Sequence, residues 1–71
     1  MWEVMLTMNG GPLSDYGVVK AANIKQLIKL LSAQLGISDL TYPKDYSVKA
    51  TTYEVCSGSR PNFFMVVTKY N

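Results

Sequence analysis

The 71-residue chain contains no histidine and a single cysteine, Cys56. One thiol cannot form a disulfide within the chain, and without histidine it cannot complete the four-ligand shell that zinc prefers. No histidine is present to activate Cys56 as a nucleophile. We therefore expect no metal, no cofactor and no thiol catalysis. The lack of paired cysteines favours a reducing compartment, such as the cytoplasm.

Acidic residues are also scarce. The five carboxylates are Glu3, Asp15, Asp39, Asp45 and Glu54. A pair of carboxylates could act as general acid and base, but four of the five flank predicted turns or face outward from predicted strands. Gly10-Gly11 is not followed by the lysine and hydroxyl residues of a phosphate-binding loop. The sequence therefore predicts that the protein is not an enzyme.

Long apolar runs are missing as well. No segment approaches the ~18 residues of a membrane span, and the start Met1-Trp2-Glu3 lacks the basic and apolar regions of a signal peptide. A hydrophobic fraction of 48% and a mean hydropathy of +0.05 are typical of a folded domain. We expect one cytoplasmic domain over residues 1–71, with no membrane contact.

Apolar–polar alternation predicts the first of four strands, and runs of β-branched and aromatic residues predict the others. The first covers Trp2 to Met8, the second 16–21, the third 46–56 and the last 63–70. In the third segment the apolar positions change from even to odd numbers. A bulge near Thr51-Thr52 would restore a common face, because it inserts one unpaired residue into the strand. Without a bulge, the strand is apolar in part on both sides.

Residues 23–35 have the apolar spacing of one helix face. Asn23 is a favourable N-cap, and Gln26 stands three residues later, as in a capping box. Gly36 fits the left-handed position that ends many helices. We predict a loop over 38–45, with Leu40 and Tyr42 as apolar anchors.

The element order β-β-α-β-β predicts a small α+β domain, in which a mainly antiparallel sheet carries one helix (about 23–35) on one face. The last strand is apolar on both sides: Phe63 and Met65 point one way, and Phe64 and Val66 the other. One helix covers one face. The second face is then either enclosed by a strongly curled sheet or left for a partner.

We therefore predict a non-catalytic protein-binding module that acts through a sheet face or edge. It would be an accessory factor or inhibitor, of the kind that phage and mobile-element genomes encode. Its partner would be another protein, a second copy in a homodimer, or both. The predicted contact residues are Tyr53, Phe63, Phe64, Val66 and Tyr70.

Nucleic acid is the alternative partner. The net charge of +2 is mild, but Lys25 and Lys29 are spaced to share one helix face. Together with Lys20, Arg60 and the aromatic residues of the sheet, they could contact phosphates and stack on bases. The sequence leaves both partner classes open.

Overall fold

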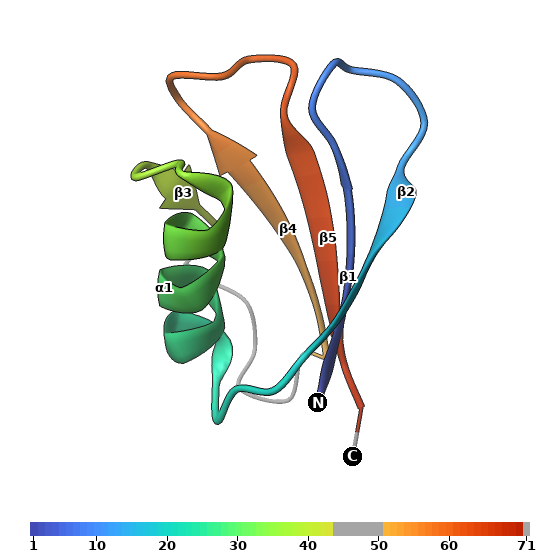
Figure 1. Ribbon diagram of the computed structural model, residues 1–71, viewed down its shortest axis with the longest axis vertical. Coiled ribbons are helices and arrows are strands. Elements are labelled where there is room, and N and C mark those ends of the chain that lie inside the picture. Colours follow the sequence, from blue (N-terminus) through green and yellow to red (C-terminus); the bar gives the residue numbers. More distant parts are fainter. Residues whose placement is uncertain (44–50, 71) are drawn as a thin grey trace.

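The computed structural model describes residues 1–43 and 51–70, which form one five-stranded sheet and one helix (Figure 1). The elements are β1 (Trp2–Thr7), β2 (Ser14–Val19), α1 (Ile24–Leu35), β3 (Leu40–Thr41), β4 (Thr52–Ser57) and β5 (Phe64–Lys69). This arrangement confirms the predicted α+β class and the single helix on one face of the sheet. The short strand β3 is added to the predicted order.

The central strand of the sheet is the last in the chain, β5, and one of its two neighbours is the first, β1. The strand order is β2-β1-β5-β4-β3, and every neighbouring pair is antiparallel. Met5 of β1 lies opposite Val66 of β5. Beyond β5, the backbone N–H of Tyr70 donates to the carbonyl oxygen of Met1 over 2.8 Å. The pairing therefore extends past both strands.

Helix α1 begins and ends as its sequence predicts. The side-chain oxygen of Asn23 accepts from the backbone N–H of Gln26 over 2.8 Å, and the Gln26 side-chain oxygen accepts from the N–H of Ala22 over 2.6 Å. Gly36 has φ 69° and donates its N–H to the carbonyl oxygen of Ser32. Glycine adopts this left-handed conformation without the strain that a Cβ would add. The predicted N-cap and C-cap are confirmed, although Gln26 bonds to Ala22 rather than to the N–H of Asn23, as a capping box would have it.

The hydrophobic core lies between α1 and one face of the sheet. Leu27 and Leu31 of the helix are fully buried. From the strands the core receives Trp2, Val4, Leu6, Leu40, Tyr53, Val55, Met65 and Val67, joined by Ile37 and Phe63 from loops. Trp2 is held by a hydrogen bond from its indole N–H to the carbonyl oxygen of Ala21 over 3.1 Å.

Two strand predictions need correction. Leu40 and Thr41, predicted within a loop, pair with Ser57 and Cys56 as β3; Leu40 is buried, as its anchoring role requires. The bulge expected near Thr51-Thr52 does not occur in β4, where register is regular from Thr52 to Cys56. Residues 46–50 of the predicted third strand lie outside the described residues.

The irregularity of the sheet lies in β2 instead. This strand runs from Ser14 to Val19 rather than over 16–21, and its register with β1 shifts between Val4 and Met5. Gly17, next to the shift, has φ 136°, a backbone conformation open to glycine but strained for other residues. The extra residue, Tyr16, reaches the helix, where its hydroxyl donates to the side-chain oxygen of Gln34 over 2.8 Å.

Candidate protein-binding face

The sheet has a second face, opposite α1, which we call the open face. Side chains alternate along a strand, so the strand residues between the buried ones point to this side. They are Glu3, Met5, Asp15, Val18, Thr41, Thr52, Glu54, Cys56, Phe64, Val66 and Thr68. By the same alternation, Thr7 of β1 also belongs to the open face, although it is buried. The described helix contributes nothing to the face, because α1 packs on the other side (Figure 1).

An apolar stripe runs along the centre of the open face. It consists of Met5, Phe64, Val66 and Cys56. Met5 lies directly opposite Val66, and Phe64 directly opposite Cys56, so the four side chains are adjacent across β1, β5 and β4. Met5, Phe64 and Val66 are half-buried, and Cys56 is exposed. The stripe is therefore accessible to an apolar partner.

Carboxylates flank the apolar stripe on both sides. In one row across the sheet, Asp15 of β2 lies opposite Met5, and Glu54 of β4 lies opposite Val66. Within the described ranges, 1–43 and 51–70, neither carboxylate makes a hydrogen bond or an ion pair. Glu3 lies in the next row, where it accepts a long 3.5 Å hydrogen bond from the hydroxyl of Tyr70.

The strands of the open face carry no compensating cation among the residues that the structure describes. The described strands contain a single basic residue, Lys69. Its ammonium lies 6.0 Å from the ring centroid of Trp2, on the helix side of the sheet. Lys25 and Lys29 are exposed on α1. Within the described strands and helix, the carboxylates therefore lie on the open face, whereas Lys25, Lys29 and Lys69 lie on the helix side.

The structure divides the predicted contact residues. Tyr53 and Phe63 are 8% and 3% exposed and belong to the core beneath α1. Phe64, Val66 and Tyr70 remain accessible, with Tyr70 at 50% exposure. Because a partner cannot reach core side chains without unfolding them, we remove Tyr53 and Phe63 from the candidate contacts. Of the two phenylalanines, Phe64 is the one that faces outward.

Pattern reasoning missed several residues of the face: Met5, Cys56, Asp15 and Glu54. The outward direction of Met5 could have been predicted from the sequence, because it lies between residues that alternate as buried positions of the first strand, Val4 and Leu6. The position of Glu54 beside Val66 depends on strand pairing, which the residues themselves do not specify.

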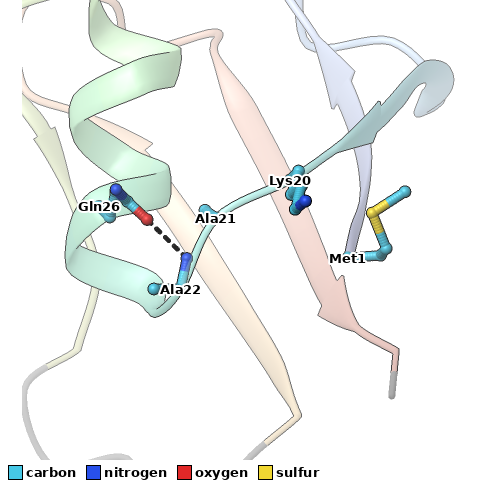
Figure 2. Close-up of a pocket in the computed structure, with 5 residues that line it drawn as sticks. All are labelled: Met1, Lys20, Ala21, Ala22 and Gln26. Atoms are coloured by element: carbon cyan, nitrogen blue, oxygen red, sulfur yellow. Dashed lines mark hydrogen bonds between the residues drawn. The ribbon is translucent and has the colours of Figure 1, made fainter.

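The residues proposed to contact phosphates do not gather in one place. Lys25 and Lys29 lie on the first half of α1, whereas Arg60 lies in the β4–β5 turn, at the opposite end of the molecule (Figure 1). Lys20 follows β2 and lines a shallow hollow of about 430 Å³ with Met1, Ala21, Ala22 and Gln26 (Figure 2). Its lining has one basic side chain, that of Lys20, and the Gln26 side chain already accepts the Ala22 N–H.

A polar cluster at the β3–β4 end of the sheet is structural. One oxygen of Asp39 accepts from the Ser57 hydroxyl over 2.6 Å, and the other accepts from the Ser59 backbone N–H over 2.6 Å. The hydrogen bond from Ser57, then that from Ser59, lowers the pKa of Asp39 below its usual 3.8. These contacts hold the turn after β4 in place.

Comparisons with protein-family models, curated proteins and solved structures find no match to this chain. Among the described residues, no three metal-binding side chains come together. Within the same ranges, the single helix is too short to cross a membrane. The open face is therefore the feature from which a function can be argued.

Proposed function

We propose that this protein is a non-catalytic binding module that docks a partner protein on the open face of its sheet. The observation that carries the proposal is the apolar stripe of Met5, Phe64, Val66 and Cys56 opposite the only described helix. Apolar side chains that adjoin one another on an exposed surface, rimmed by polar groups, are typical of protein interfaces.

The stripe has no evident role in holding the fold together. The core on the other face contains fully buried residues from the helix and from three strands, such as Leu31, Val4 and Met65. Threonine already occupies the open face at Thr52 and Thr68, next to the stripe. Threonine at the stripe positions would keep strand propensity and remove apolar surface. The apolar side chains are thus explained better by binding than by folding.

Burial of the stripe by a partner would supply useful binding energy. Each 100 Å² of apolar surface removed from water contributes about 2.5 kcal/mol before the cost of ordering the partners. Phenylalanine and methionine at the centre are residue types enriched in interface cores, whereas acidic residues are more common at their rims. The arrangement of Met5 and Val66 between Asp15 and Glu54, with Phe64 in the adjoining row, follows that pattern.

The test compares capture of a partner from the source cell by three proteins: the unchanged chain, Val66→Asp and Leu30→Asp. Leu30 is the matched control because it is an exposed leucine, 38% accessible, on the helix side. We expect the unchanged chain and L30D to retain the same partner and V66D to lose it. Circular dichroism melts establish that both variants fold.

Capture by V66D at the level of the unchanged chain, with its melt intact, would refute the proposal. A second readout is independent of this substitution. The partner should slow alkylation of Cys56, which is exposed on the stripe and is the only cysteine in the chain. A bound partner that leaves the alkylation rate unchanged would place the interface elsewhere.

A further inference from the structure

We infer that the open face accepts an amphipathic helix with basic flanks, supplied by a different protein. This inference rests on the proposed function and specifies the partner's chemistry. It follows from three observations: the sign of the charges around the apolar stripe, the spacing of these charges across the sheet, and the burial of the apolar side of α1 in the chain's own core.

The charges favour a cationic partner. Asp15 and Glu54 flank the stripe, and Glu3 lies one row away, whereas no lysine or arginine of the described strands faces this side. An anionic surface such as nucleic acid or an acidic membrane would be repelled by the three carboxylates. Lysine or arginine on the partner would instead form ion pairs at the rim, where such pairs speed association and set orientation.

The spacing of the carboxylates fits a helix. Asp15, Met5, Val66 and Glu54 form one row across β2, β1, β5 and β4. Strands lie about 4.8 Å apart, so the outer two positions of the row are about 14 Å apart. A helix with its side chains is about 10–12 Å wide. It would lie along β1 and β5, with its apolar side on the stripe and a basic side chain over each carboxylate.

A second copy is a poorer occupant. Two open faces placed against each other would bring six carboxylates together. The helix of a second copy carries Lys25 and Lys29, but its apolar side is already buried, with Leu27 and Leu31 fully covered. The outward side of that helix offers Leu30 as its exposed large apolar residue. The occupant therefore needs its own free apolar side, which another protein must supply.

The test uses three 18-residue peptides: one with leucines on one helix face and lysines beside them, one with glutamates in place of the lysines, and one with the leucines of the first scrambled. Binding is measured by fluorescence anisotropy and by protection of Cys56 from alkylation. We expect the lysine peptide with patterned leucines to bind, to protect Cys56, and to bind more weakly as salt rises. The other two should not protect Cys56.

A matched pair of variants tests the carboxylates. The first pair, Asp15→Asn with Glu54→Gln, raises the net charge by two on the open face. The second pair, Ala33→Lys with Ser38→Lys, raises it by the same amount at exposed positions outside the sheet. We expect the first pair to weaken binding of the lysine peptide by about tenfold, and the second to weaken it much less. If the two pairs weakened binding equally, the peptide would be responding to the net charge of the protein and not to the open face, and the inference would be wrong.

The remaining outcomes separate this inference from the proposed function. If the glutamate peptide binds equally well or no peptide protects Cys56, a basic helix is not the occupant, while capture of a partner that V66D abolishes would leave the binding module intact. If light scattering shows a dimer that Lys25→Glu with Lys29→Glu disrupts, the occupant is a second copy. If capture also fails to depend on Val66, both ideas are wrong.

Discussion

Ser57, the last residue of β4, donates its hydroxyl to a carboxylate oxygen of Asp39, just before β3, over 2.6 Å. Asp39 also accepts from the Ser59 hydroxyl over 3.0 Å. One carboxylate thus ties the loop after α1 to the turn between β4 and β5. The contacts favour the ionised form and lower the pKa of Asp39.

This lowered pKa predicts how stability responds to acid. A carboxyl group with a lower pKa in the folded state stabilises the fold fully above its unfolded pKa, near 3.8 for Asp39. The contribution is lost as pH falls through the lower folded value. We expect Asp39→Asn to lower the melting temperature at pH 7 and to flatten its decline below pH 4. Melts from pH 2 to 7 would show this; Asp15→Asn, at an exposed position, is the control.

The core predicts a large effect for truncation of Leu31, which is fully buried beneath the sheet. Leu31→Ala should cost about 2–5 kcal/mol, since it removes buried methyl groups and leaves a cavity. A chain of this size has a total stability of about 4–10 kcal/mol, so the variant should lose about half of its stability. Urea titration measures the loss. Leu30→Ala, on the exposed side, should change stability by no more than about 0.5 kcal/mol.

The start of α1 predicts a selective effect at Asn23, whose side chain accepts from the Gln26 N–H. Asn23→Ala should reduce the free energy of unfolding by about 1 kcal/mol. Asn23→Asp keeps an acceptor in place and should preserve most of the stability. If chemical denaturation gave equal losses for both variants, the hydrogen bond would not be the source of the effect.

The orientation of β4 predicts the reactivity of Cys56. Its thiol is exposed on the open face, so a thiol reagent should modify the native protein within about tenfold of the rate in urea. The double variant Cys56→Ser with Val55→Cys moves the thiol by one residue to the buried face. It should react far more slowly until denatured. Comparable native rates for the two proteins would contradict the assigned faces of β4.

Local signals were sufficient for the helix and for the fold class. Asn23 and Gly36 act on backbone groups within a few residues, so their roles follow from the sequence alone. The same holds for β1, where Trp2, Val4 and Leu6 alternate with less buried residues. Such contacts need no knowledge of which strands are neighbours.

The open face could be predicted only in part, because it depends on the global arrangement. Phe63 and Phe64 are equivalent in residue type and adjacent in sequence, and only the position of α1 makes Phe63 buried and Phe64 accessible. Glu54 becomes a neighbour of Val66 through the β4–β5 register. The irregularity of β2 was not predicted because Gly17 gives no periodic signal. The change of phase before Tyr53 suggested a bulge near Thr51-Thr52 instead, but β4 is regular from Thr52 to Cys56.

The central pairing of β1 with β5 also constrains the order of folding. Residues near Met1 meet residues near Tyr70, so the middle of the sheet depends on contacts between distant parts of the chain. Pairings of this kind require closure of a long loop before they yield stabilising contacts, and they slow folding. On the ribosome, β1, β2 and α1 would emerge first, with one side of β1 unpaired. The sheet can be completed only after β5 has left the exit tunnel.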